Sequence, residues 1–243
     1  MAKTVSEAIE YRRSVRKYKK IQIDELKVKN CIKNATLAPN SSNMQLWEFY
    51  HVTDKTILKK LSKACFEQNA AKTAINMVVF VARRDKWKIR AKQNLNFLEK
   101  MFEKQEKEGI NVDRRRKVSN RYYKKLMPTI YTDFFGIIGL YKKILSFFIG
   151  LFRPIYREVL ISDLKVITHK SIALAAQNFM LSMSEIGYDT CPMEGSDTNR
   201  VKKILKLPYK AEINMIVACG IRSEKGIYSD RFRVPFDEVY KKI

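Results

Sequence analysis

Apolar and polar positions in the first fifty residues follow two periods, one helical and one extended. Apolar residues recur at helical spacing over residues 4–13, which predicts a short first helix. Asp24 is a favourable N-cap residue and Pro39 a natural stop, so we expect a second helix between them. The buried stripe of this helix should carry Leu26, Val28, Cys31, Ile32 and Ala35. Residues 47–52 then alternate large apolar with polar side chains, which predicts a strand.

The middle of the chain continues both patterns. Thr53 or Asp54 is placed to begin another helix, and most of residues 83–125 are charged and helical in pattern. Between these segments, residues 76–82 form a nearly continuous apolar run. Such a run suits a strand that is covered on both faces.

The last third is the most orderly part of the pattern. Residues 172–186 are rich in small and apolar side chains and predict a buried helix, which Gly187 is placed to end. Residues 191–195 are predicted to form a turn-like loop, and a helix should follow over residues 197–205. Residues 213–219 form a further strand-like run.

The stretch 126–160 is rich in large apolar residues, among them Phe134 and Phe135. A membrane-spanning helix needs about 20 mostly apolar residues. Lys142 and Lys143 fall near the middle of that window, where each costs roughly 2.5–3.5 kcal/mol of insertion free energy. We therefore do not expect a spanning helix. An amphipathic lid, a subunit-interface element and an interfacial membrane contact all fit the pattern.

The composition is that of an ordinary folded protein, with 243 residues of which 46% are hydrophobic and 30% are charged. We find no internal repeat and no linker, so residues 1–243 are predicted to form a single domain with an apolar insertion at about 126–160. The 48 Lys and Arg residues outnumber the 25 Asp and Glu residues, and this net charge of +23 favours anionic partners. Because lysines are spread along nearly every segment and no nucleic-acid-binding motif is present, we expect no specific nucleic-acid partner.

The cysteines and histidines do not suggest a metal site. Cys31, Cys65, Cys191 and Cys219 are far apart in the sequence, which argues against a zinc site or a disulfide framework. Both histidines are isolated, and we expect them to be structural. The first residues lead directly into an amphipathic segment without the apolar core of a signal peptide, so we expect a cytoplasmic protein.

Candidate chemistry begins with a cluster of arginines near the N-terminus. Arg12, Arg13, Ser14 and Arg16 place three guanidiniums and a hydroxyl within five residues. If a helix continues through them, Arg12 and Arg16 share a face, and if the segment is extended, Ser14 joins them. Either geometry directs two arginines at one anion, because guanidinium is a planar, permanently charged donor for phosphate or carboxylate oxygens.

A second pair of arginines, Arg231 and Arg233, would lie on one face of an extended segment near the other end of the chain. Between the two clusters lie an amide-rich loop at 39–47 and a Pro-Glu-Gly-containing loop at 192–195. The sequence contains no dinucleotide-binding glycine loop, P-loop, nucleophile elbow or zinc-protease motif. This set of residues suits a phosphorylated aromatic ligand whose ring edge contacts amides while arginines hold its phosphate.

These four stretches, in this order and spacing, resemble the FMN-dependent nitroreductase family. The residues that carry the resemblance are 12–16 (RRSVR), 38–47 (APNSSNMQLW), 192–195 (PMEG) and 231–235 (RFRVP). The resemblance covers nearly the whole chain except about residues 85–165. It implies an α+β fold with a central, mostly antiparallel sheet flanked by helices. It also implies an intertwined homodimer that holds FMN at the subunit interface.

The cofactor-binding residues that the resemblance implies form three groups. The group at the phosphate is Arg12, Ser14, Arg231 and Arg233, with Arg13 as a further cofactor-binding residue, while Arg16 would reach the ribityl chain or the N1/O2 edge of the flavin. The amide group, contributed by the same subunit or its partner, is Ser41, Asn43 and Gln45. The group at the flavin ring is Pro192, Glu194 and Gly195. No residue is assigned as acid, base or nucleophile, since the flavin carries the chemistry.

The implied activity is that of an FMN oxidoreductase in which NADPH or NADH delivers hydride to flavin N5 and is then replaced by a small-molecule acceptor such as a nitroaromatic or quinone. Leu46 stands where the family commonly has proline, and Lys72 is a candidate for the family's lysine near flavin O2. The same contacts fit reductive dehalogenation, flavin fragmentation or flavin storage. A basic protein that binds nucleic acid or a membrane surface is the alternative from another class.

Overall fold

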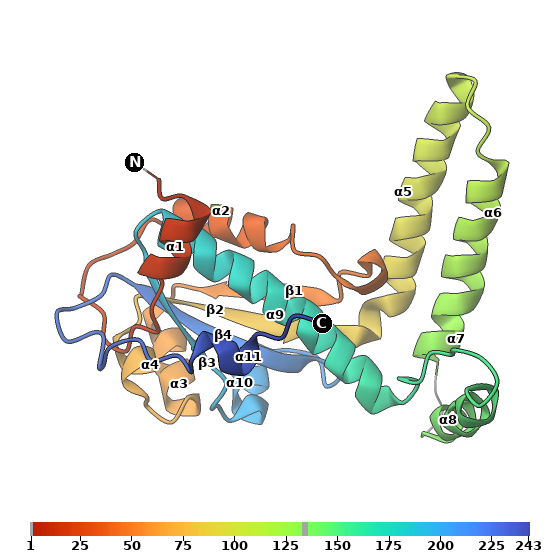
Figure 1. The fold of residues 1–243 in the computed structure, drawn as a ribbon. Helices are drawn as coiled ribbons and strands as arrows, with labels where there is room; N and C mark the ends of the chain where they lie inside the picture. The colour runs from red at the N-terminus through yellow and green to blue at the C-terminus, as the bar shows by residue number, and fades with distance from the viewer. Residues whose placement is uncertain (1, 133–135) are drawn as a thin grey trace.

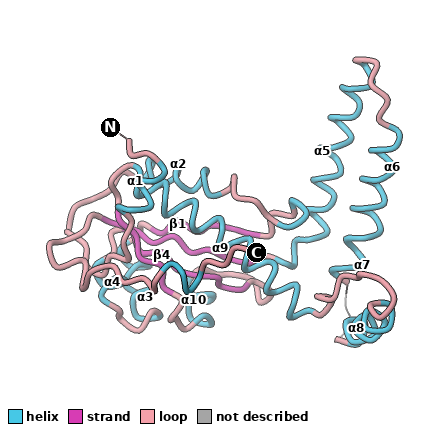
Figure 2. Tube along the Cα trace, in the orientation of Figure 1, coloured by secondary structure: helices cyan, strands magenta, loops and turns pink. Residues whose placement is uncertain are grey.

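The computed structural model describes residues 2–132 and 136–243, and its centre is a four-stranded sheet with helices on both faces (Figures 1 and 2). All three strand pairings are antiparallel, and the strand order is β1-β2-β4-β3. The strands are β1 (Trp47–Val52), β2 (Asn76–Ala82), β3 (Asp189–Met193) and β4 (Glu212–Gly220). The predicted α+β class with a central antiparallel sheet is therefore confirmed.

Side chains of β2 point alternately into two separate apolar cores, which explains why this strand is buried along its whole length. One core joins the sheet to α3 (Lys55–Ala64), α4 (Asn69–Thr73) and α10 (Thr198–Ile204). The other joins it to α2 (Glu25–Ala35) and α9 (Ile161–Glu185), and α1 (Val5–Tyr11) packs on α9. The prediction of a strand covered on both faces is confirmed.

Several helices begin at the predicted capping residues. The side chains of Asp24, Asp54 and Asp197 accept backbone N–H groups of the first turns of α2, α3 and α10, at 2.8, 2.8 and 3.0 Å. The buried helix α9 begins at Ile161, earlier than predicted. It ends just before Gly187, whose φ of 81° is a conformation that glycine adopts without strain.

Two local predictions were wrong. Leu26 was expected on the buried face of α2, but it is 64% exposed, because α2 packs on α9 through later positions such as Val28 and Cys31. Residues 191–193 were expected in a turn, but they belong to β3 and pair with β4. Pro192 is compatible with this strand because β3 is an edge of the sheet, where the missing N–H breaks no ladder.

A polar cluster joins α9 to the start of β4. Arg84, Lys165 and His169 all contact the carboxylate of Glu212. Burial alone would raise the pKa of Glu212, but hydrogen bonds from these three side chains outweigh it and lower the pKa to about 2. His169 also lies 3.0 Å from the side-chain nitrogen of Asn214. His169 is thus joined to β4 by two polar contacts, and its structural role stays a prediction.

The segment between β2 and α9 projects from the sheet (Figure 1). After the short turn η2 (Arg84–Lys86), α5 (Trp87–Lys107) and α6 (Asp113–Arg121) form a helical hairpin in which Arg116 pairs with Glu99 and Glu106. A π-helical turn η3 (Tyr122–Leu126), α7 (Met127–Tyr131) and α8 (Ile137–Ile149) follow. Phe134 and Phe135 lie outside the described residues. Over 2–132 and 136–243, no helix combines the length and apolar content that a membrane span requires.

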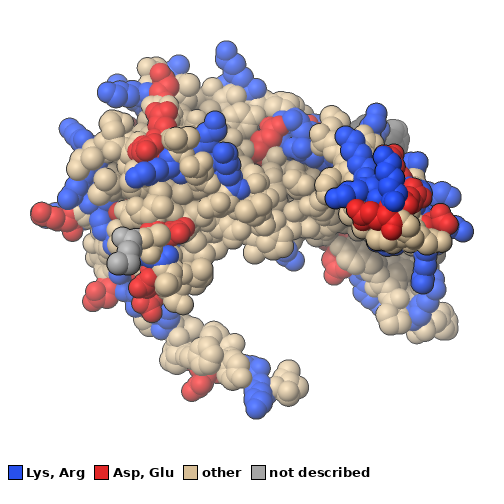
Figure 3. Space-filling model, turned by 90° about the horizontal axis from the view of Figure 1, so that it is seen from above, with Lys and Arg blue, Asp and Glu red and all other residues tan. Residues whose placement is uncertain are grey.

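Residues 232–243 lie away from the body of the protein as a C-terminal arm. This arm contains α11 (Phe236–Val239). Figure 3 shows it standing away from the molecule beside an open hollow. Apolar side chains of the arm are exposed, with Phe232 at 78% and Phe236 at 69%. Exposed aromatic residues on an extended segment are typical of a surface that another chain covers.

Candidate functional site

The two arginine clusters predicted from the sequence meet in one cleft of about 350 Å³. The wall from the N-terminal segment is formed by Arg12, Arg13, Ser14 and Arg16. The opposite wall comes from residues 227–233, which include Arg231 and Arg233. Residues more than two hundred positions apart in the sequence are therefore brought to one site, as the anion-binding hypothesis requires.

Backbone contacts hold the two walls together. Val15 is fully buried, and its N–H donates to the carbonyl of Thr190 at 3.1 Å, which fixes the N-terminal segment on β3. A guanidinium nitrogen of Arg231 donates to the carbonyls of Glu10 and Arg12 at 2.7 and 2.6 Å. Arg13 donates to the carbonyl of Ser229 at 2.5 Å. Arg13 and Arg231 thus hold the two walls together, whereas the Arg233 side chain donates to the carbonyl of its neighbour Phe232.

The electrostatics of the cleft favour an anion. Burial, followed by the nearby charges of Arg231 and Arg233, lowers the pKa of Arg12. Five arginines line or border the cleft, and Asp230 is the one carboxylate among its described lining residues. Such a concentration of positive charge is unfavourable unless an anion neutralises it. A phosphate is well matched, because guanidinium forms paired, charge-assisted hydrogen bonds with its oxygens.

The Pro-Glu-Gly-containing loop follows β3, and Thr190 of β3 accepts the N–H of Val15 from the N-terminal wall of the cleft. Burial raises the pKa of Cys191, the residue between Thr190 and this loop. Glu194 is exposed, and the carbonyl of Gly195 accepts a hydrogen bond of 2.8 Å from Gln68. Pro192, Glu194 and Gly195 are not among the described residues that line the arginine cleft, so their role at the flavin ring stays a prediction.

Helix α4 also reaches this region. The side-chain nitrogen of Asn69 donates to the hydroxyl of Tyr228, a residue of the cleft wall, at 2.7 Å. Lys72 lies on the same short helix and is exposed. Its assignment to the flavin O2 edge stays a prediction.

An ion pair between Asp189 and Arg222, which the sequence did not reveal, lies next to the N-terminal wall of the cleft. The carboxylate of Asp189 is 1% exposed and accepts from the backbone N–H and Nε of Arg222, at 2.7 and 2.8 Å. The guanidinium of Arg222 lies 4.1 Å from the ring centre of Tyr11 and bonds the Tyr11 carbonyl, next to Arg12. Burial would lower the pKa of Arg222, but its bond to Asp189 raises it. No local motif marks this pair, because its members are joined only by the fold.

The amide loop is anchored by alternate residues. Met44 and Leu46 are buried in a small core with α5 and α7, whereas Ser41 and Asn43 are exposed and Gln45 is half-buried. Two residues of the short turn η1 (Ser41–Asn43) and the nearby Gln45 have left-handed backbone, with φ of 55° at Ser42, 50° at Asn43 and 46° at Gln45. Such strain persists only where surrounding contacts enforce it, and it is common at binding sites.

The contacts that hold this loop come from α5 and η3, and no local motif marks them. Asn94 of α5 exchanges two hydrogen bonds of 2.8 Å with Asn43. The hydroxyl of Tyr122 lies 2.6 Å from the hydroxyl of Ser42, and Tyr123 donates to the Ser42 carbonyl at 3.1 Å. The projecting segment is therefore the scaffold of the amide loop.

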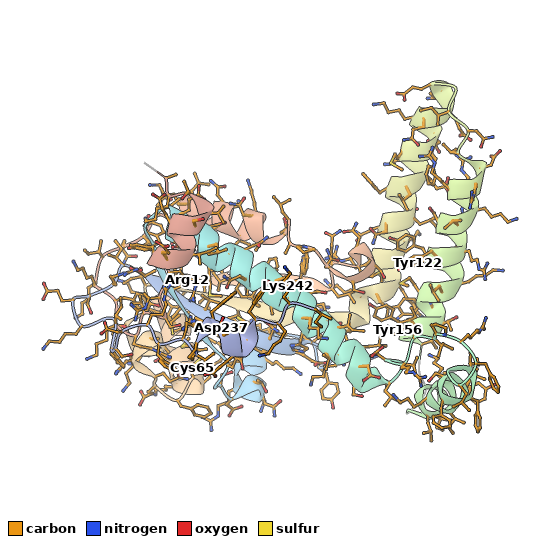
Figure 4. The ribbon with its side chains drawn as sticks, in the orientation of Figure 1. Arg12, Cys65, Tyr122, Tyr156, Asp237 and Lys242 are labelled. Atoms are coloured by element: carbon orange, nitrogen blue, oxygen red, sulfur yellow. The ribbon has the colours of Figure 1, made fainter. Side chains whose placement is uncertain are left out.

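The arginine cleft and the amide loop lie at opposite corners of the sheet. The loop precedes Trp47 at the start of β1, and the cleft adjoins Thr190 in β3, so the two sites lie on the two edge strands. They also lie at opposite ends of the ladder, which separates the corners by about 20 Å along the strands and about 14 Å across them. Figure 4 shows Arg12 and Tyr122, which contacts the loop, on opposite sides of the molecule. One chain does not bring its two sets of predicted residues together.

A second cavity, of about 490 Å³, opens beside the amide loop. Its walls are mainly apolar and come from η3, α7, α8 and the start of α9, with Ser41 and Ser42 at one side. Tyr122, Tyr131 and Tyr156 contribute aromatic surface. Part of the apolar stretch 126–160 therefore lines a cavity next to predicted site residues. Apolar cavities with a few polar groups are typical small-molecule sites.

Comparison with known proteins gives one consistent result. Residues 9–131 and 156–221 match the family described as the Nitroreductase family. Protein DrgA of Synechocystis is 27% identical over 191 residues, which cover 78% of this chain and 70% of that protein. The crystal structure of ydfN, a candidate nitroreductase of Bacillus subtilis, superposes with a TM-score of 0.73 at 19% identity and 98% coverage of both chains. A candidate nitroreductase from Exiguobacterium sibiricum, solved in complex with FMN, has a TM-score of 0.65 at 19% identity, covering 100% of this chain and 99% of that one.

Proposed function

Since the chain belongs to the nitroreductase family and has its fold, we propose that it is an FMN-dependent oxidoreductase that uses NADPH or NADH. The observation that carries the proposal is the arginine cleft, where Arg12, Ser14 and Arg233 surround a space suited to a phosphate. When bound, FMN would accept hydride from the nicotinamide donor and pass the electrons to an acceptor in ping-pong turnover.

The residues of the chain would bind and orient the cofactor. Arg12, Ser14 and Arg233 would hold the phosphate, with Arg13 and Arg231 keeping the walls of the cleft in place. Arg16, on the same segment, would place a positive charge towards the ring edge, where it favours the reduced, anionic form. The loop at Pro192, Glu194 and Gly195 would support the ring. The amides at Asn43 and Gln45 would complete the polar contacts.

These contacts can meet on one flavin only if the amide loop comes from a second copy of the chain. Because the cleft and the loop of one chain lie at opposite corners of the sheet, we propose an intertwined homodimer with two equivalent sites. The exposed aromatic residues of the C-terminal arm and the hollow beside it in Figure 3 support the same arrangement.

The apolar cavity beside the amide loop would receive the acceptor. Its lining is mainly apolar and includes three tyrosines, with Lys142 and Glu158 as charged members, and it lies next to the loop that would contact the flavin of the partner. A flat, apolar acceptor such as a quinone or nitroaromatic suits these walls.

The visible spectrum of the purified protein tests the proposal. The protein should show flavin bands, at the start or after incubation with FMN, and these should bleach when NADPH or NADH is added without oxygen. Bands that persist with both donors would favour flavin storage or another electron source. A protein that fails to bind FMN but binds nucleic acid, with affinity that falls steeply as salt rises, would contradict the proposal.

A further inference from the structure

Helix α8 has its polar and apolar faces reversed relative to an ordinary surface helix. Gly139 and Ser146 are buried, and the ammonium group of Lys142 donates to the carbonyls of Thr129 and Thr132. The outward face of the helix and the turn after it carry large apolar side chains that are 51–89% exposed, namely Ile137, Leu140, Tyr141, Ile144, Phe147, Phe148, Leu151 and Phe152. A helix of a soluble surface normally buries its apolar stripe.

The exposed residues form one continuous stripe. Leu140, Ile144 and Phe148 recur at intervals of four residues within the helix, so they lie above one another on one side of it, and Leu151 follows in the turn after the helix. Tyr141 and Phe152 extend the stripe with aromatic surface. An exposed apolar patch of this extent marks a contact with another apolar phase or molecule.

The charges beside the stripe identify the occupant. Residues 136–157 contain Lys142, Lys143, Arg153 and Arg157 and no Asp or Glu. In the described ranges, none of these four side chains forms an ion pair with a carboxylate. Lys142 points to the inward side, while Lys143 and Arg157 donate to backbone carbonyls, which leaves their charges without a carboxylate partner in the described ranges. An apolar stripe beside such uncompensated basic groups and aromatic rings matches an anionic lipid surface, which offers phosphates above an apolar interior.

We propose that α8 docks the protein on anionic bilayers by lying in the plane of the interface. The helix has 13 residues and is about 20 Å long, which is too short to cross an apolar layer of about 30 Å. Its apolar face would enter the boundary of the acyl chains, while Arg153 and Lys143 contact headgroup phosphates. Packing the stripes of two copies together would instead bring their unneutralised positive charges into contact.

Docking would also place the apolar cavity at the membrane. Leu145 and Ser146 of α8 form part of its wall, so one side of the helix faces the cavity and the other faces the lipid. An apolar molecule dissolved in the bilayer would then reach the cavity without crossing bulk water. The docking proposal itself does not depend on the identity of the redox reaction.

Vesicle co-sedimentation of the full-length protein tests the proposal. The protein should sediment with vesicles of phosphatidylcholine and phosphatidylglycerol, and much less with phosphatidylcholine alone. The triple variant Leu140→Glu, Ile144→Glu, Phe148→Glu should lose at least about tenfold in vesicle affinity. The matched control Leu26→Glu, Leu37→Glu, Phe66→Glu makes the same charge change at apolar residues that are 64–78% exposed elsewhere, and it should bind like the wild type.

Three results would overturn the proposal. The first is a wild-type protein that ignores anionic vesicles even at low salt. The second is equal binding by the α8 variant and the wild type, which would assign binding to lysines dispersed over the surface. The third is a wild-type protein that binds no vesicles together with an α8 variant that is a smaller oligomer than the wild type by light scattering. This result would show that another copy of the chain covers the stripe. Unchanged thermal unfolding of both variants is the check that they are folded.

Discussion

The arginines of the cleft divide into those that build it and those left to bind. Arg13 and Arg231 donate hydrogen bonds to backbone carbonyls, and Arg222 is paired with buried Asp189. In the described part of the chain, the one hydrogen bond of the Arg233 side chain is to the carbonyl of its neighbour Phe232, at 2.6 Å. Replacing Arg233 should therefore affect ligand binding more than folding.

Arg233→Ala should weaken FMN binding by about 10- to 100-fold, because one charge-assisted contact to phosphate contributes roughly 1.5–3 kcal/mol. Titration of the apoprotein with FMN, followed by flavin fluorescence, measures this change. Arg121→Ala is the control, since it removes the same charge from an exposed position on α6. Equal FMN affinity of Arg233→Ala and the wild type would remove the C-terminal arm from the phosphate site.

Glu212 makes a separate prediction about pH. Its folded pKa of about 2 lies below the value of an unfolded glutamate, so its stabilising effect is present above about pH 5 and is lost as the pH falls towards 2. Glu212→Gln should lower the free energy of unfolding by about 1–2 kcal/mol at neutral pH, a figure reduced for partial solvent exposure. Urea unfolding at a series of pH values should show the difference from the wild type narrowing below pH 5. A difference independent of pH would show that the ion pairs do not stabilise the fold.

At the scale of elements, the projecting segment holds the amide loop in its conformation. It presents Asn94 and Tyr122 to the amide loop, where left-handed backbone at three non-glycine residues needs support. A change in α5 can therefore alter a site to which α5 contributes no ligand.

Asn94→Ala should reduce FMN affinity and lower the free energy of unfolding by about 1–3 kcal/mol, because it removes two hydrogen bonds that hold Asn43 in its left-handed conformation. Asn96→Ala is a matched control with the same chemistry on an exposed position of α5. FMN titration and urea unfolding of both variants measure the two effects. If the two variants behaved alike, the loop would be held by other contacts.

Elements with local causes could be predicted from the sequence. Asp24, Asp54 and Asp197 cap helices through bonds to residues two or three positions away, so their neighbours in the sequence suffice. The edge strand β3 could not be predicted, because Pro192 signals a turn locally and only pairing with β4 makes the segment extended. The outward direction of the α8 stripe was equally hidden, since periodicity shows that a face exists and not what it contacts.

At the scale of the whole molecule, strand order and antiparallel register determine how far the arginine cleft lies from the amide loop. The sequence suggested that the arginines and the amides bind one ligand, but their separation follows from strand order and from which ends of β1 and β3 they occupy. A twofold axis would bring the cleft of one copy to the loop of the other and create two equal sites. The central claim is therefore that each flavin is held by two chains.

Complementation between two inactive variants tests this claim most directly. One chain carries Arg12→Ala and Arg233→Ala, and the other carries Asn43→Ala and Gln45→Ala, with different affinity tags. Each variant alone should retain little FMN, since every site in its homodimer is damaged. The mixed dimer should contain one undamaged site, formed by the cleft of the second chain and the loop of the first, and should bind about one FMN per dimer. A mixed dimer that binds no more FMN than either variant alone would contradict the shared site.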